Sequence, residues 1–359
     1  MTKQSQKGGD NSNNLQCRDL TIINNEGTTP AEVREIAKAV FVENFYTLAG
    51  NAPTTAMHRS EEITENFLQK LQQENPEGLA MAQDPDFQYG LFTVQKEYAR
   101  HGDKDLGELL IDILVERSKH DKRNLLQIVL NEALEVAPKL TQEQMAALSI
   151  AAFIRYIIPK FKDADIVDFD LGAQLDNYIR PFVDHLSKDP MNYNHLVYSG
   201  CVTNYSISES FLIQGPLHKN CCGLFFNGLR IKEMGDVEGI QTKYPSLFMP
   251  CPWGEYGDEE QVAAMNWDHL QKLMDDLDIS ILEKKIVGEL FSNSRMDINE
   301  YRGKCEIIRP YMAKVFEFLD GSYMGYMRVT SVGIAIAHAN IKRHVGEFAD
   351  LSNWINKAS

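Results

Sequence analysis

The chain lacks the features that would take it into a membrane or onto nucleic acid. None of its apolar runs reaches the roughly 18–20 residues that a membrane-spanning helix needs. The residues after Met1 are polar, so no secretory signal peptide is expected. With 36 Lys and Arg against 51 Asp and Glu, the net charge is −15, which disfavours binding to phosphate backbones. We therefore expect a cytoplasmic protein with no membrane partner and no nucleic-acid partner.

Familiar catalytic motifs are also missing. The sequence contains no G-x-S-x-G elbow, no G-x-x-x-x-G-K-[ST] phosphate loop and no H-E-x-x-H helix. The stretch from Gly223 to Gly228 holds Leu224, Phe225 and Phe226, which does not suit a phosphate loop. The sequence thus leaves any catalytic residue unknown, predicts no cofactor, and favours a non-enzyme over an enzyme.

Cysteine is scarce, and it never occurs in a C-x2-C pair. Six cysteines in 359 residues do not form the framework of a secreted disulfide protein, so we expect reduced thiols. The residues that come nearest to a metal-ligand set are Cys201, His218, Cys221, Cys222 and Cys251. Zinc usually binds between two paired knuckles, so no metal site is predicted. Buried structural cysteines are the favoured interpretation, with redox sensing as an alternative.

A cysteine–histidine nucleophile is possible in principle between Cys201 and either His195 or His338. A chain with six cysteines and nine histidines offers many such pairs by chance. His338 lies within the apolar, small-residue stretch 333–340, where a core or interface role is favoured over catalysis.

Most of the chain has the apolar spacing of helices. Over residues 105–161, apolar residues recur three and four positions apart, which predicts three consecutive helices at the centre of the protein. Thr141 and Gln144 predict a capping box for the third helix, which should span residues 145–158 and end at Pro159. The predicted fold is mainly α: a multi-helix globular protein with a short N-terminal β-arm and an irregular region rich in cysteine and aromatic residues.

Other helices follow from the same spacing. Thr29-Pro30-Ala31-Glu32 combines an N-cap, a proline at the first helical position and a capping glutamate. Further helices are expected from near Ser60, at 87–101, at 171–186 with Pro181 inside, at about 259–277, 279–292 and 304–319, and at about 323–344. Asp163, Asp165, Asp168 and Asp170 lack the spacing of a calcium loop, so we interpret them as a solvated acidic turn before a helix.

Changes in composition divide the chain into four parts. We expect a polar arm at 1–28, a helical domain at 29–194, an irregular insertion or boundary region at 195–255 and a C-terminal helical part at 256–359. Within the arm, residues 8–23 join turn-forming residues to an extended apolar run. A lone strand is unstable in water, so this segment is either a tail or a strand that pairs between identical subunits.

Several stretches resemble a known group of proteins. Residues 82–89, 131–140 and 331–340 are similar to an uncharacterised family of bacterial helical proteins, and the resemblance spans most of the chain. It implies bacterial origin and a shared fold, and it assigns no catalytic residue. Residues 9–16, with 19–22, resemble the Gly-Asp-Asn-rich arms that precede some bacterial anti-phage and conflict proteins.

Two functions are compatible with these observations. The favoured one is a non-enzymatic, homo-oligomeric, cytoplasmic sensing or interaction protein that self-associates through residues 8–23 and acts in anti-phage defence. Its protein partner or small ligand is not specified by the sequence. The alternative is an enzyme or a small-molecule-binding protein that uses residues 195–255, which a concave pocket with convergent polar groups in that region would favour.

Overall fold

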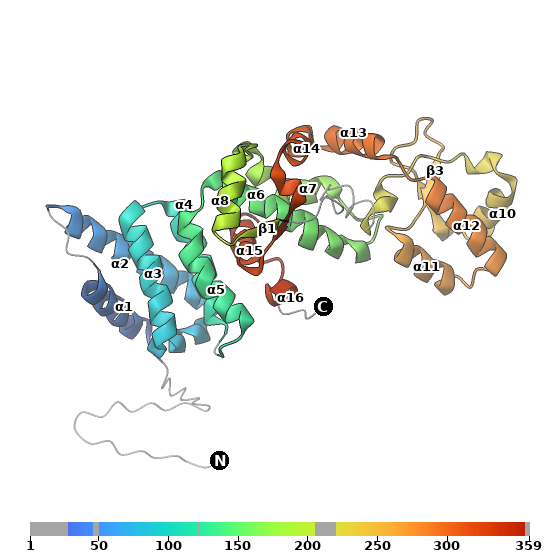
Figure 1. Ribbon diagram of the computed structural model, residues 1–359. Coiled ribbons are helices and arrows are strands. Elements are labelled where there is room, and N and C mark those ends of the chain that lie inside the picture. Colours follow the sequence, from blue (N-terminus) through green and yellow to red (C-terminus); the bar gives the residue numbers. More distant parts are fainter. Residues whose placement is uncertain (1–27, 46–49, 121, 205–219, 356–359) are drawn as a thin grey trace, which may run out of the picture.

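Helices dominate the structure, so the predicted mainly α fold is confirmed. The structure is a computed structural model that describes residues 28–45, 50–120, 122–204 and 220–355. Figure 1 shows an elongated molecule with residues 30–136 at one end and residues 235–293 at the other. Within the described residues, no helix is both long enough and apolar enough to cross a membrane. The predicted N-terminal β-arm lies outside the described residues.

Among the described residues, the N-terminal part of the chain forms six α-helices. They are α1 (Pro30–Asn44), α2 (Ala52–Glu74), α3 (Pro85–His101), α4 (Lys104–Ser118), α5 (Leu125–Val136) and α6 (Gln142–Ala152). Both predicted capping boxes are present, Thr29 with Glu32 and Thr141 with Gln144. The helix predicted to begin near Ser60 begins at Ala52 instead, because Pro53 occupies its first turn, where a missing N–H is harmless.

Two predicted helices change their winding near a proline. After α6 the chain widens into a π-helix at Phe153–Ile157 and then tightens into a 3-10 helix at Ile158–Asp163, so the single helix predicted at 145–158 is wrong in its second half. Helix α7 (Leu171–Tyr178) likewise gives way to a 3-10 helix at Arg180–His185. Proline lacks the amide that an α-helix needs and clashes one turn back, and the 3-10 segments accept it in their first turn.

The C-terminal part of the chain packs against the N-terminal helices. It comprises α13 (Ile298–Ile308), α14 (Met312–Gly321), a 3-10 helix at Tyr323–Tyr326, β4 (Met327–Val329), α15 (Ser331–Val345) and α16 (Ser352–Ile355). Pro310 lies between α13 and α14, where one helix was predicted. Helix α15 packs against α4, α5, α6 and α7 and so lies at the centre of this body.

A short antiparallel sheet joins the C-terminal part to the N-terminal helices. Strand β1 (Val202–Asn204) follows α8 (Pro190–Tyr198) and pairs with β4, with Val202 opposite Val329. The helix predicted from Tyr323 is therefore wrong over its first two turns. In β4, Met327 and Val329 are buried while Arg328 is exposed, and this alternation suits a strand. We call the described residues up to 204 and from 297 onward the main body.

Residues 222–296 form a separate small lobe with its own hydrophobic core. The lobe contains α10 (Gly235–Lys243), β2 (Phe248–Pro250), β3 (Glu260–Val262), α11 (Trp267–Asp276) and α12 (Ile281–Asn293). Its core joins Phe226 and Leu247 to Leu270 and Phe291, and so draws on both sides of the division predicted at residue 255. Residues 260–262, predicted as helix, pair instead with β2.

The two ends of the small lobe meet in a narrow neck. The backbone N–H of Met296 donates to the carbonyl oxygen of Phe225 at 3.0 Å, and the N–H of Asn227 donates to that of Ser294 at 2.8 Å. The lobe therefore leaves and rejoins the main body at one place.

Candidate functional site

A pocket of about 440 Å³ opens where the small lobe meets the main body. We call it the lobe pocket. The main body contributes the loop before α7 and the end of α13, and the small lobe contributes residues near its neck, β2 and β3. Its apolar lining includes Ile166, Phe169, Leu224, Met249, Trp253 and Ile308, and its polar lining is Asp168, Asp170, Gln261 and Arg309. This size and this mostly apolar lining with a few polar groups are typical of small-molecule sites.

Gln261 is the polar residue that is least satisfied in this lining. It lies on β3 and is only 1% exposed. Its side-chain Nε2 donates to the carbonyl oxygen of Gly223 at 2.8 Å, but its Oε1 is buried without a hydrogen-bond partner among the described residues. Leaving such an acceptor unpaired costs about 1–3 kcal/mol. An N–H or O–H group of a ligand in the pocket would satisfy it.

Trp253 supplies a fixed apolar wall. Its indole Nε1 donates to the carbonyl oxygen of Leu224 at 2.8 Å, and the Nζ of Lys304 lies 4.9 Å from the centre of its ring. A ring held in this way offers apolar contact without losing further rotational freedom when a ligand binds.

Gly223 allows two segments of the small lobe to pack closely beside the pocket. A Cβ atom at this position would lie 2.0 Å from the carbonyl oxygen of Ala264, so no other residue fits without a backbone shift. The N–H of Gly223 donates to the carbonyl oxygen of Met265 at 2.9 Å, and its own carbonyl holds Gln261. Gly223 thus holds the side chain of Gln261 in place through its carbonyl oxygen.

The charge at the pocket is set by an ion pair and an acidic turn. The guanidinium of Arg309 pairs with Asp176, with Nη2 2.6 Å from Oδ2, and Tyr311 donates to the same carboxylate at 2.9 Å. The hydrogen bonds from Arg309 lower the pKa of Asp176 and outweigh the effect of burial, which raises it. Because Arg309 is neutralised, the exposed Asp168 and Asp170 leave the rim negative. Such a rim favours neutral or cationic ligands over anions.

The acidic turn behaves as the sequence predicts. Asp163, Asp165, Asp168 and Asp170 are all exposed, and the side chain of Asp170 caps α7 by accepting from the N–H of Ala173 at 2.9 Å. The sequence did not indicate that this turn borders a pocket, because the opposite wall lies about 50 to 90 residues further along the chain.

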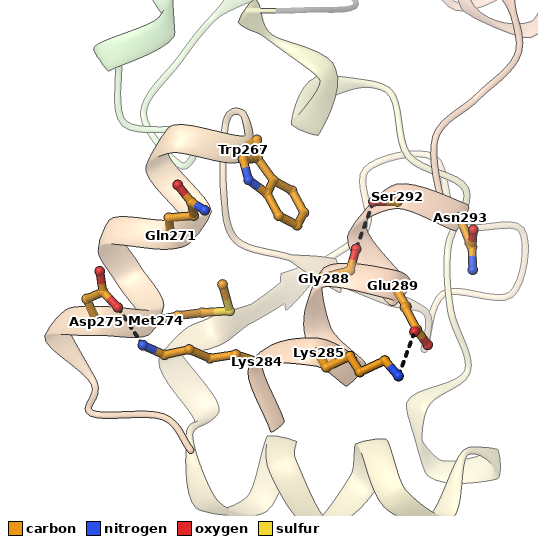
Figure 2. A pocket seen from close by; sticks show the side chains of 10 residues that line it. All are labelled: Trp267, Gln271, Met274, Asp275, Lys284, Lys285, Gly288, Glu289, Ser292 and Asn293. Atoms are coloured by element: carbon orange, nitrogen blue, oxygen red, sulfur yellow. Dashed lines mark hydrogen bonds and ion pairs between the residues drawn. The ribbon is translucent and has the colours of Figure 1, made fainter. Parts of the chain in front are cut away.

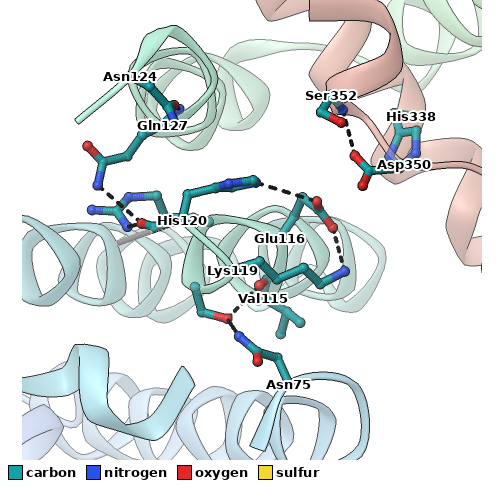
Figure 3. A network of polar contacts seen from close by, with 12 residues as sticks. Asn75, Val115, Glu116, Lys119, His120, Asn124, Gln127, His338, Asp350 and Ser352 are labelled. Carbon is teal, nitrogen blue, oxygen red and sulfur yellow. Dashed lines mark hydrogen bonds and ion pairs between the residues drawn. The ribbon is translucent and has the colours of Figure 1, made fainter. Parts of the chain in front are cut away.

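A second polar assembly joins α4 to the end of the chain. Figure 3 shows Glu116 between Lys119 and His120, on the side of α4 that faces His338 and Asp350. Burial raises the pKa of Glu116, but the neighbouring His120 ring, whose Nε2 lies 3.8 Å from the carboxylate, and a hydrogen bond from Lys119 at 2.7 Å outweigh it and lower that pKa to about 2. The carboxylate therefore stays ionised inside the protein.

Lys342 on α15 extends this assembly. It is 5% exposed and pairs with Glu74 on α2 and with Glu347 after α15, both at 2.5 Å. Burial lowers the pKa of Lys342, but its two carboxylate partners outweigh this and raise it. Since these charges are paired with one another, we interpret the assembly as a structural junction.

The predicted metal candidates do not form a ligand set in the described part of the chain. There, no group of three His, Cys, Asp or Glu side chains is placed to hold a metal ion. Burial raises the pKa of Cys221 to about 12 and also raises the pKa values of Cys201, Cys222 and Cys251. Protonated thiols are poor ligands and poor nucleophiles. His218 lies outside the described residues. The expectation that this set of residues binds no metal therefore stays a prediction.

The two histidines considered with Cys201 contact other groups. The Nδ1 of His195 lies 2.9 to 3.1 Å from the side-chain amide of Gln144, and the Nε2 of His338 lies 2.7 Å from the carbonyl oxygen of Ala349. The His338 ring also packs against Phe348 and is 4% exposed. Its surroundings are those of a core histidine.

Comparison with known proteins identifies a family. A protein-family model with the description ":-like" matches residues 27–355, and the chain therefore belongs to that family. Its description names no ligand and no reaction. No curated protein matches the chain. No solved structure matches it either.

Proposed function

We propose that this chain is a non-enzymatic sensing protein of the bacterial cytoplasm and that its lobe pocket binds a small molecule. The observation that carries the proposal is the unpartnered Oε1 of Gln261, which is buried at the wall of a pocket that Trp253 also lines. The described residues that line this pocket include no thiol, hydroxyl or imidazole group, which supports binding over covalent catalysis.

The lining selects a class of ligand. Trp253 and Phe169 favour a ring with an apolar surface, and Gln261 requires an N–H or O–H donor. The negative rim of Asp168 and Asp170 excludes anions. The ligand is therefore a neutral or cationic ring compound that carries a hydrogen-bond donor.

The position of the pocket explains how binding would be sensed. The pocket is lined by residues of both the main body and the small lobe, and the lobe is joined to the main body through the neck. A ligand that touches both walls stabilises one orientation of the lobe over others. Self-association through residues 8–23 would carry this change to neighbouring subunits, as an anti-phage sensor requires.

Fluorine NMR of protein labelled with fluorotryptophan tests this proposal. The chain has three tryptophans, so Trp253 reports on the lobe pocket and Trp354 serves as an internal control in the main body. Phenethylamine and phenylacetamide should shift the Trp253 resonance, whereas anionic phenylacetate should not.

Two matched variants complete the test. Gln261→Met should weaken phenylacetamide binding about tenfold, which corresponds to about 1.4 kcal/mol. Gln95→Met is the control, because Gln95 is also 1% exposed with an unpartnered Oε1 but does not line the lobe pocket. The proposal would be overturned if none of the three probes shifts the Trp253 resonance, or if the Gln261→Met and Gln95→Met variants bind phenylacetamide equally well.

A further inference from the structure

A second hollow of about 600 Å³ lies on the small lobe between α11 and α12. We call it the helix groove. Figure 2 shows its two walls: Trp267, Gln271 and Met274 on α11 face Gly288 and Ser292 on α12. These positions recur three or four residues apart on each helix, so each wall is one continuous helix face. The groove is independent of the lobe pocket and shares none of its lining residues.

Trp267 is a partly exposed platform at one end of the groove. Its side is held by the Phe291 ring, which meets it edge-on with centroids 6.0 Å apart. A Cβ atom at Gly288 would lie 3.0 Å from the Cη2 of Trp267, so the missing side chain makes room for the indole. The residue remains 39% exposed, which leaves ring surface open to a ligand.

The charges of the groove cancel. Lys284 pairs with Asp275 across the groove, and Lys285 lies 4.0 Å from Glu289 along α12. Two cations and two anions that already pair with one another provide no net attraction for a phosphate, a carboxylate or an ammonium group. The groove therefore suits a neutral ligand.

Two side-chain amides in the lining remain available. Among the described residues, neither Gln271 nor Asn293 has a hydrogen-bond partner for its side chain, and both are exposed at the groove. Each amide offers donors and an acceptor. A ligand with hydroxyl groups, which both donate and accept, would match them.

We propose that the helix groove binds a neutral saccharide. A pyranose ring presents a face of C–H groups, which stacks on an aromatic ring, and an edge of hydroxyl groups, which pairs with amides and carboxylates. The lining of the groove includes Trp267, Gln271 and Asn293 and has no net charge, and the groove is open enough to admit part of a longer chain. No other described part of the protein combines these features.

A glycan array with the labelled full-length protein tests this inference. The intact protein should bind at least one neutral glycan, and the same oligosaccharide free in solution should compete. Gln271→Ala and Asn293→Ala should each weaken binding at least fivefold. Lys272→Ala is the control, because Lys272 neighbours Gln271 on α11 but does not line the groove. In fluorine NMR the bound oligosaccharide should shift the Trp267 resonance and leave Trp253 unchanged.

Three results would overturn the inference. They are an array with no neutral glycan bound, equal binding by the Gln271→Ala and Lys272→Ala variants, and a Trp267 resonance that responds to amphipathic helical peptides but not to sugars. Since Trp253 reports on the lobe pocket and Trp267 on the helix groove, failure of one proposal is distinguishable from failure of the other.

Discussion

The main body and the small lobe use their polar residues in opposite ways. In the main body, Glu116 and Lys342 are both buried. Glu116 pairs with Lys119, and Lys342 on α15 pairs with Glu74 on α2, which holds helices together. In the small lobe, Gln261 has an unused acceptor, and Gln271 and Asn293 have unused amides at hollows. The charges of Glu116 and Lys342 thus stabilise the body, whereas the unpaired amide groups named in the lobe lie at hollows; the unpaired Oε1 of Gln95 in the body lies at neither hollow.

This difference follows from packing. The core of the main body surrounds α15 with helices on several sides, so a polar group there must find a partner or destabilise the fold. The lobe is built around a smaller core with two short strands and three short α-helices. Its surface therefore carries hollows that a tightly packed bundle fills with side chains.

The largest effect is expected from two matched glycines, one in each region. A Cβ atom at Gly333 in α15 would lie 2.2 Å from the carbonyl oxygen of Cys201, and one at Gly223 would lie 2.0 Å from that of Ala264. We expect Gly333→Val to lower the free energy of unfolding of the main body by at least about 4 kcal/mol. Gly223→Val would also bring a Cβ atom within 2.9 Å of Ile166 in the main body, and it should remove more protection from the lobe core than from the main core, as measured by hydrogen exchange. Equal loss of protection in both regions would show that they unfold as one unit.

Removing a buried cation tests the structural junction. Lys342→Met removes the nearest cation of Glu74 and Glu347 and leaves them only the more distant Lys70 and Lys119, and we expect a loss of about 3 kcal/mol in the free energy of unfolding. The exposed Lys285→Met in the lobe should cost less than about 0.5 kcal/mol, because surface pairs contribute little. Urea unfolding measures both. Similar costs for the two lysines would contradict the contrast drawn between the regions.

Acid should weaken the main body through Glu116. Its pKa is about 2 in the folded protein and 4.5 ordinarily, so its contribution is fully present above about pH 4.5 and is lost as the pH falls toward 2. This shift is worth about 3 kcal/mol at most. Glu116→Gln should flatten the dependence of the unfolding free energy on pH over that window.

The lobe offers a matched carboxylate for this test. Hydrogen bonds from Ser280 and Lys243 lower the pKa of Glu283 to about 2 as well, but Glu283 caps α12 near the surface. Glu283→Gln should therefore change the pH dependence less than Glu116→Gln does, and added salt should reduce its effect further. A larger effect from Glu283 would reverse our assignment of the structural charges.

The smallest effect on stability is expected from the arm. Deleting residues 1–27 should leave the free energy of unfolding unchanged within about 0.5 kcal/mol, because the two cores begin beyond it. The deletion should nevertheless lower the mass per particle in light scattering, since residues 8–23 are proposed to pair between subunits. A full-length monomer, or an unchanged particle mass after deletion, would remove self-association from the proposed function.

Local signals in the sequence predicted much of the helical body. The capping residues Thr29 and Thr141 indicate helix starts because their partners lie only three residues away. The pairing of Val202 with Val329 was not predicted, because it joins three-residue strands far apart in the chain. The same holds for the lobe pocket. Gln261 matters only because Gly223 and the turn before α7 come to lie beside it, and neither proximity leaves a pattern in the sequence.

The central helix of the main body is made long after the helices that it packs against. Helix α15 begins at Ser331, yet it packs against α4, α5 and α6, which are complete by Ala152. At the usual rate of synthesis, the ribosome needs roughly 10 to 35 s to add the residues in between. During this interval the apolar face that α15 covers has no native partner. The growing chain is therefore expected to depend on chaperones, and a chain that stops before Ser331 should aggregate even though every earlier helix is intact.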